Sequence, residues 1–181
     1  MNHAQLHRHI WQELTSATHD REHEWRRPVL ATLGLDRQPN ARTVVLRQAL
    51  EDSGKLVFFT DRRSPKVSEL QEWPQGMLVF WSTQLRWQLR VAAQFRVITS
   101  GHEVDAAWSR MAASAAADYL SANTPGQPLA GSGRTTAELR DDHQLAVVVA
   151  GIKSMDWLAL GLDGRHQRIL FADGTAQPLS P

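Results

Sequence analysis

Residues 29–60 read VLATLGLDRQPNARTVVLRQALEDSGKLVFFT. Three runs rich in β-branched and aromatic residues, Val29–Leu35, Thr43–Leu50 and Leu56–Thr60, are separated here by the turn-forming stretches DRQPN and EDSG. Short apolar runs bounded by Gly, Pro, Asn and Asp are typical of strands joined by hairpins. The segment therefore predicts three consecutive antiparallel strands.

The chain beyond this segment continues the same pattern. Ser64 and Pro65 are favoured at the N-cap and first turn of a helix, and Pro74 ends that helix. Further strands are expected at Met77–Trp81, Trp87–Thr99, Leu145–Val149, Trp157–Leu160 and Arg168–Ala172. Six or more strands with too few helices for crossovers favour an antiparallel β-barrel with peripheral helices over a parallel doubly wound sheet.

The remaining segments are expected to lie around the barrel. Apolar residues recur every four positions in an amphipathic helix predicted from Gln5 to Ala17, and the charged run His19–Arg27 reads as a connector. Alanine-rich Glu103–Ala122 favours a helix, and Asn123–Arg134 is a loop long enough for a binding role. We expect one domain over residues 1–181, in which residues 1–27 form the N-terminal helix and connector.

Composition excludes several classes of protein. The 181 residues include no cysteine, so a disulfide framework, a thiolate metal site and a cysteine nucleophile are all ruled out. The net charge of +1 argues against an electrostatic nucleic-acid binder. No apolar run approaches the roughly 20 residues of a membrane span, and the polar N-terminus lacks a signal core. We expect a cytoplasmic protein that binds neither nucleic acid nor a membrane.

Nucleotide and metal motifs are weak in this chain. It has neither the strand–GxGxxG–helix pattern nor GxxxxGK[ST]. His19-Asp-Arg-Glu-His23 matches the HxxEH zinc pattern, but it lies in the charged connector and has no identifiable third ligand. We therefore expect no metal site.

Positive charge is concentrated between Arg37 and Lys66, where seven basic residues stand against three acidic ones. The cluster precedes and enters the helix expected after Ser64, whose first N–H groups and positive dipole end favour an anion. Arginines on the adjoining strand could bind phosphate oxygens bidentately. The competing interpretation is a solvated strand face that carries charge for solubility.

Five separated motifs resemble, in order and spacing, the pyridoxamine 5′-phosphate oxidase family, and the resemblance covers most of the chain. They are Arg42-Thr-Val-Val-Leu-Arg47, Phe58-Phe-Thr60, Ser64-Pro-Lys66, Trp87-Gln-Leu-Arg-Val91 and Trp157 with His166-Gln-Arg168. The alanine-rich helix and Thr124-Pro-Gly-Gln-Pro-Leu129 look more like the oxidase-related FMN-binding branch than the biosynthetic oxidase. This resemblance implies an FMN-binding split β-barrel.

The resemblance also implies which residues contact FMN. Arg42 to Arg47 match the family's strand whose ends contact the cofactor, Phe59 and Thr60 match an aromatic–Thr pair, and Lys66 matches a phosphate-binding lysine. The implied cofactor set is Arg42, Thr43, Val44, Val45, Leu46, Arg47, Phe59, Thr60, Arg63, Ser64, Lys66, Gln88, Trp157 and Arg168.

In the family, Trp157 and Arg168 would come from the partner subunit, so the resemblance implies a homodimer with FMN at the interface. Strict strand alternation would place Arg42 and Arg47 on opposite faces. Either a β-bulge intervenes or the two arginines serve different parts of the site.

Matches to the family's substrate residues are Arg47, Arg110, Ser114 and His166. The sequence departs from the biosynthetic oxidases where Pro65 replaces an arginine, where Ala106 falls near the position of a tyrosine, and where Gly164 replaces another arginine. Arg62 or Arg63 could replace the lost phosphate contact at Pro65.

We therefore expect an FMN-dependent oxidoreductase of the pyridoxamine 5′-phosphate oxidase type, in which hydride passes from a small-molecule substrate to FMN. No side chain is assigned as catalytic. The alternatives are a flavin reductase or other FMN oxidoreductase with a different small substrate, and a non-catalytic FMN carrier or sensor.

Overall fold

The computed structural model describes residues 2–128, 142–162 and 164–181. Its centre is an antiparallel sheet with the order β2-β1-β5-β6-β7-β4-β3, to which β8 and β9 are added at one end of β7. The strands are β1 Val29–Leu33, β2 Pro39–Thr43, β3 Leu46–Leu50, β4 Lys55–Asp61, β5 Gln75–Ser82, β6 Trp87–Ile98, β7 Leu145–Ala159, β8 Gln167–Ala172 and β9 Thr175–Leu179. The expected antiparallel barrel is confirmed, and the sheet is split rather than closed.

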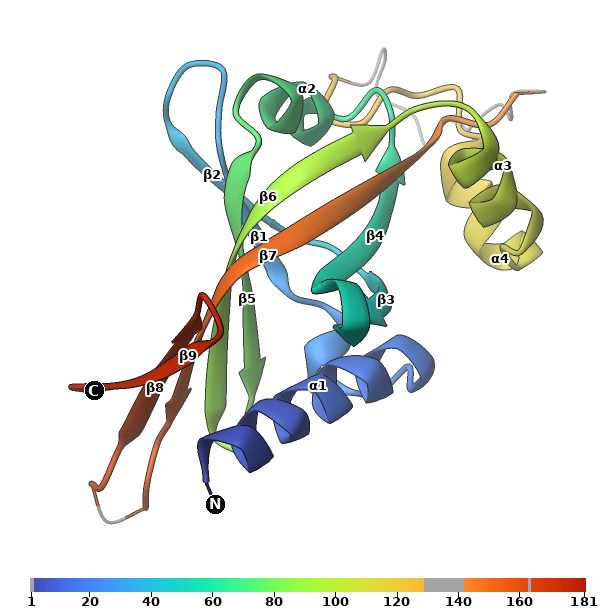
Figure 1. The fold of residues 1–181 in the computed structure, drawn as a ribbon. Coiled ribbons are helices and arrows are strands. Elements are labelled where there is room, and N and C mark those ends of the chain that lie inside the picture. The colour runs from blue at the N-terminus through green and yellow to red at the C-terminus, as the bar shows by residue number, and fades with distance from the viewer. Residues whose placement is uncertain (1, 129–141, 163) are drawn as a thin grey trace.

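The split occurs along β7, which pairs with β6 over most of its length. On its other edge, residues up to Gly151 pair with β4, whereas residues from Ser154 onward pair with β8. In Figure 1, β8 and β9 accordingly extend as an arm beside the C-terminal half of β7, away from α3 and α4. The edge of β7 that faces away from β6 therefore has β4 as its neighbour at the N-terminal end and β8 at the C-terminal end.

The main core lies inside the curved sheet, beneath α1 His3–His19. Leu6, Ile10 and Leu14 recur on one face of this helix and are buried against strand residues such as Leu46 and Phe80. The helix begins with a capping box in which Asn2 and Gln5 exchange side-chain-to-backbone hydrogen bonds. The predicted N-terminal helix is confirmed and is slightly longer at both ends.

Two segments of the predicted secondary structure were wrong in detail. The run Thr43–Leu50 is not one strand: β2 ends at Thr43 and β3 begins at Leu46. Glu103–Ala122 is not one helix, because α3 His102–Ser109 ends at Arg110 and is followed by α4 Ala113–Ala116 and the 3-10 turn η3 Ala117–Tyr119. Alanine favours helix locally, but packing of Tyr119 into a second core under α3 bends the chain.

Other boundaries differ less. Leu145–Val149 and Trp157–Leu160, expected as two strands, belong to the single strand β7, and β9 was not predicted. Short 3-10 turns occur at Glu24–Arg26 (η1) and Glu51–Ser53 (η2). The helix expected after Ser64 is α2 Pro65–Glu72, with Ser64 at its N-cap. Residues 129–134 of the expected loop lie outside the described residues.

The HxxEH motif does not occupy one helical face. α1 ends at His19, and His23 instead caps the turn η1 by accepting a hydrogen bond from the Trp25 N–H at Nδ1. Its Nε2 lies 3.1 Å from Glu13 Oε2. Within the described part of the chain, no group of three or more His, Asp or Glu side chains could hold a metal ion.

None of the helices in the described part of the chain has the length and apolar character needed to cross a lipid bilayer.

Candidate cofactor site

The first group of predicted cofactor residues gathers where β4 ends and α2 begins. Lys66, in the first turn of α2, donates hydrogen bonds from Nζ to Thr60 Oγ1 at 3.1 Å and to Ser64 Oγ at 2.5 Å. Both hydroxyl residues are buried. The three side chains therefore form a compact polar cluster at one end of β4.

The ammonium of Lys66 is held without a carboxylate partner in an ion pair within the described residues. Burial lowers the pKa of Lys66, and the nearby positive charge of Arg42 lowers it further, while Glu69 and Asp61 oppose the shift from a distance. A bound anion would raise the pKa of Lys66 again, because an opposite charge nearby favours the protonated ammonium.

Arg42, at the β2 end of the site, is bound to a buried carboxylate. Its Nη2 donates to Glu69 Oε2 at 2.7 Å, and its Nη1 donates to Thr32 Oγ1. Glu69 also accepts from Thr32 at 2.6 Å and from Asn40 at 2.8 Å. Burial raises the pKa of Glu69, but these hydrogen bonds and the charge of Arg42 outweigh it, so the pKa is lowered and the carboxylate is ionised.

Arg47 lies at the other end of the RTVVLR stretch, where the pairing of β3 with β4 shifts register between Leu46 and Gln48. The sequence left a β-bulge between the two arginines as one of two possibilities, and the structure has a shift in strand pairing at Arg47 itself. The guanidinium carbon lies 5.7 Å from the centroid of the Phe59 ring. The buried Nε atom has no hydrogen-bond partner among the described residues.

Between the two arginines, the backbone of Val44 and Val45 leaves the sheet and joins β2 to β3. Val44 and Leu46 are buried, whereas Thr43 is exposed. Arg42 and Arg47 consequently belong to different strands.

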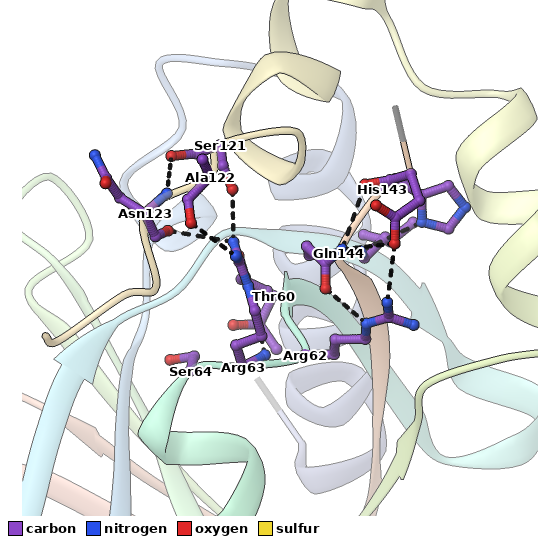
Figure 2. A network of polar contacts seen from close by, with 12 residues as sticks. Thr60, Arg62, Arg63, Ser64, Ser121, Ala122, Asn123, His143 and Gln144 are labelled. Carbon is purple, nitrogen blue, oxygen red and sulfur yellow. Dashed lines mark hydrogen bonds and ion pairs between the residues drawn. The ribbon is translucent and has the colours of Figure 1, made fainter. Parts of the chain in front are cut away.

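Arg63 has partners of its own. It donates to both carboxylate oxygens of Asp61, from Nε at 3.0 Å and from Nη2 at 2.6 Å, and this hydrogen bonding raises its pKa. The same guanidinium also reaches backbone carbonyls of residues 121–123 (Figure 2). Arg62 points to the opposite side, towards Gln144 and Asp142.

The second group of predicted residues lies far from the first within one chain. Gln88 on β6 pairs with Leu158 on β7, which pairs in turn with Arg168 on β8. Thr60 instead pairs with Ala146. Twelve residues of β7 separate the two places, about 40 Å along an extended strand.

Gln88 and Arg168 share one face of the sheet, because they occupy the same cross-strand row. Arg168 donates to Asp156 from Nε at 3.0 Å and from Nη2 at 2.8 Å, and Arg90 also donates to this carboxylate. The hydrogen bonds from Arg168 lower the pKa of Asp156.

Trp157 lies on the other face, in the core. It is 3% exposed, and its ring packs edge-to-face against Trp87 with centroids 5.1 Å apart. Its indole Nε1 is buried and has no hydrogen-bond partner among the described residues.

The predicted substrate residues are divided in the same way. Arg110 caps the C-terminal end of α3, where its Nε donates to the Ala106 carbonyl at 2.9 Å, and Ser114 lies on α4. Both are exposed at the end of β7 that is close to Arg47 and Phe59. His166 is exposed on the connection from β7 to β8, at the opposite end.

Sequence reasoning missed three residues that shape the site: Glu69, Asp61 and Tyr119. The signal for Glu69 was its position three residues after Lys66, which places both on neighbouring turns of α2. Tyr119 is the only tyrosine of the chain. Nothing in the local sequence indicates that it approaches Arg47, because that contact depends on the tertiary fold.

The residues present fit a ligand that combines a phosphate with a flat ring. The hydroxyls of Ser64 and Thr60 with the desolvated ammonium of Lys66 suit phosphate oxygens. The unpartnered Nε of Arg47 beside Phe59 suits a polar atom on an aromatic edge. A split β-barrel with this cluster has the polar and aromatic side chains that a ring compound with a phosphate would need.

A family model described as the pyridoxamine 5′-phosphate oxidase FMN-binding domain matches residues 8–99. The chain belongs to this family, and FMN is the cofactor of its domain. The match includes all predicted site residues from Arg42 to Gln88.

Curated relatives agree with this assignment. The pyridoxine/pyridoxamine 5′-phosphate oxidase of Thermosynechococcus vestitus is 40% identical over 91 residues, which are 50% of this chain and 41% of the relative. That of Chromohalobacter salexigens is 43% identical over 91 residues, 49% of this chain and 40% of the relative. The match therefore spans about two fifths of the length of these relatives.

Solved structures show the same fold. A pyridoxamine 5′-phosphate oxidase-related, FMN-binding protein from Nostoc punctiforme superposes with a TM-score of 0.79 at 23% identity and covers 100% of both chains. PhzG from Burkholderia lata, in complex with tetrahydrophenazine-1-carboxylic acid, has a TM-score of 0.72 at 18% identity and covers 98% of this chain and 91% of that one.

Proposed function

We propose that this chain is an FMN-dependent oxidoreductase that acts as a homodimer, with each cofactor site assembled from two subunits. FMN, when bound, supplies a ring that accepts a hydride from the substrate. The protein then has to bind the phosphate, orient the ring and present a small molecule to it. No side chain is required as a nucleophile.

The separation of the two residue groups along β7 carries this proposal. Lys66 and Thr60 belong to one end of the strand, and Gln88 and Arg168 to the other. One FMN cannot span about 40 Å of strand, whereas an isologous dimer could bring one subunit's first group against the partner subunit's second group.

The roles follow from the chemistry of each side chain. Lys66, Ser64 and Thr60 bind the phosphate, and Arg47 lies beside the ring together with Phe59. Glu69 already neutralises the charge of Arg42 in an ion pair, so Arg42 adds little net positive charge to the phosphate site.

The second group completes the ring's surroundings from the partner subunit. Gln88 has no side-chain hydrogen bond within the described chain and can offer both its amide N–H and its carbonyl to a flavin edge. Arg168 is held in a fixed orientation by Asp156. Trp157, buried on the other face of the sheet, does not belong to the surface on which Gln88 and Arg168 lie.

The substrate in this proposal is a small molecule with an anionic group, bound by Arg47, Arg110 and Ser114 of one subunit and His166 of the partner subunit. The names of the curated relatives favour pyridoxine or pyridoxamine 5′-phosphate. Pro65, Ala106 and Gly164, which differ from the biosynthetic pattern, favour a second candidate: an FMN oxidoreductase with another small substrate.

Assay of the FMN-loaded protein separates these functions. Pyridoxamine 5′-phosphate should bleach the flavin absorbance without oxygen and yield peroxide with oxygen. Bleaching by reduced nicotinamide alone would support the second candidate. A flavin that no donor reduces, and that is not reoxidised by air after chemical reduction, would contradict an oxidoreductase and support a carrier. A cytoplasmic location stays a prediction.

A further inference from the structure

The segment Tyr119–Gln127, called the strap below, runs from one end of the candidate cofactor site to the other. It follows η3 and leads towards the residues that the structure does not describe. Three separate contacts attach it to the residues that flank the site. The sequence analysis predicted none of these three contacts.

The first contact is between Tyr119 and Arg47. Tyr119 is 8% exposed and packs with Val57, Leu145 and Val147 under α3. Burial raises the pKa of its phenol, and the nearby positive charge of Arg47 opposes this shift. The start of the strap therefore lies near the side chain expected beside the flavin ring.

The second contact is Arg63, which binds three consecutive carbonyls of the strap. Nη2 donates to Ser121 O at 2.8 Å and to Asn123 O at 3.2 Å, and Nη1 donates to Ala122 O at 3.3 Å. The bidentate pair with Asp61 fixes the guanidinium while it does so. The planar fork of arginine can serve a carboxylate and several carbonyls together, which a lysine cannot.

The third contact lies at the start of α2. A Cβ added at Gly126 would meet Pro65 Cγ at 3.2 Å, so the strap backbone packs directly on this proline. Gly126 also has a φ of +81°, a conformation that favours glycine. Pro65 is flanked by Ser64 and Lys66, the proposed phosphate residues.

We propose that Arg63 is a positioning residue that holds the strap in place between Arg47 and α2. Through the strap, Arg63 sets the orientation of Arg47 and the packing of Gly126 on Pro65, next to the proposed phosphate residues. Its Nε and Nη2 donors are engaged by Asp61 and by strap carbonyls, so it acts through the strap and not as a direct phosphate ligand. This inference rests on the proposed FMN site.

Hydrogen exchange and flavin titration of the full chain test the inference together. The variants are Arg63→Ala, Arg63→Lys and the control Arg8→Ala, which removes an exposed arginine of α1. Amide exchange over residues 119–127 is measured without cofactor. Affinities for FMN and for riboflavin, which lacks the phosphate, are measured by fluorescence quenching.

We expect Arg63→Ala and Arg63→Lys to speed exchange in the strap and to weaken FMN and riboflavin by the same factor, at least about tenfold for the loss of several charge-assisted hydrogen bonds. Arg8→Ala should match the wild type. Unchanged strap exchange in Arg63→Ala would overturn the inference. So would a loss of FMN affinity alone that Arg63→Lys restores, because it would show a direct phosphate contact.

Failure of the proposed function gives a different result. If the wild-type chain binds neither FMN nor riboflavin, the cofactor site is wrong. The proposed effect of Arg63 on that site is then wrong as well. Faster strap exchange in Arg63→Ala alone would still show that Arg63 holds the strap in place.

Discussion

Arg42 Nη2 and Glu69 Oε2 lie 2.7 Å apart and join β2 to α2 through a carboxylate whose side chain is only 5% exposed. Thr32 and Asn40 donate to the same carboxylate, so the ion pair lies in a satisfied polar network. This network fixes the start of the RTVVLR stretch against the helix that carries Lys66.

Glu69→Ala should destabilise the fold by about 3 kcal/mol, because it leaves the charge of Arg42 and the buried donors without their partner. The matched control is Glu72→Ala, at the exposed end of the same helix. Urea unfolding of both variants measures the difference. Equal stability of the two variants would contradict a structural role for the ion pair.

Stability should also depend on pH through Glu69. Its folded-state pKa is lowered, so the contribution of the carboxylate is complete above about pH 4.3, the usual value of a glutamate, and is lost as the pH falls through the lowered value. Glu69→Gln should flatten this part of the acid unfolding profile. An identical profile in the wild type and the variant would show that other carboxylates determine acid unfolding.

Lys66→Met should weaken FMN by about 10- to 100-fold, the value of one charge-assisted hydrogen bond to a phosphate, and leave riboflavin unaffected. Lys153→Met, at an exposed lysine on β7, serves as the control. Fluorescence titration with both flavins gives the affinities. Parallel losses for FMN and riboflavin would argue against a phosphate contact.

The FMN affinity should fall as the pH rises through the lowered pKa of Lys66, below the usual lysine value of about 10.4. Phosphate binds the charged ammonium, which the free protein loses earlier than an exposed lysine would. Titrations above pH 7, where the phosphate is a dianion, isolate this effect. If Lys66→Met retains the same pH dependence, another group is responsible.

Trp157→Phe should change the free energy of unfolding by no more than about 1 kcal/mol, because the lost N–H has no hydrogen bond and the ring still fills most of the space. Trp157→Ala should cost about 3–5 kcal/mol through the cavity beside Trp87. A loss of FMN affinity in Trp157→Phe at unchanged stability would support the cofactor role implied by the sequence.

The strand pattern and the family resemblance predicted the barrel, and Ser64 and Pro65 predicted the start of the helix that carries Lys66 in its first turn. These features depend on local periodicity and on short-range spacing. The break between Thr43 and Leu46 was not predicted, because Val44, Val45 and Leu46 form an uninterrupted β-prone run. At the break, Arg42 is bound to Glu69 of α2, and the pairing of β3 with β4 shifts register between Leu46 and Gln48. Both features depend on segments distant in the sequence.

The partners of Arg63 and Tyr119 were also beyond sequence reasoning. Arg63 is separated from Ser121 by 58 positions, and its fork meets backbone carbonyls, which every residue has. The helical propensity of the alanine-rich run hid the turn that carries Tyr119 back to β4. Contacts between distant segments thus account for most of what the sequence did not reveal.

Subunit mixing tests the shared FMN site most directly. Lys66→Met and Arg168→Ala homodimers should each bind FMN weakly, while random mixing after unfolding and refolding should restore tight sites in mixed dimers. If both residues contact one FMN across the interface, tight binding returns at about one quarter of a site per chain, because half of the dimers are mixed and each has one intact site. Absence of any restored tight site, with mixed dimers confirmed by native mass spectrometry, would contradict a site shared between subunits.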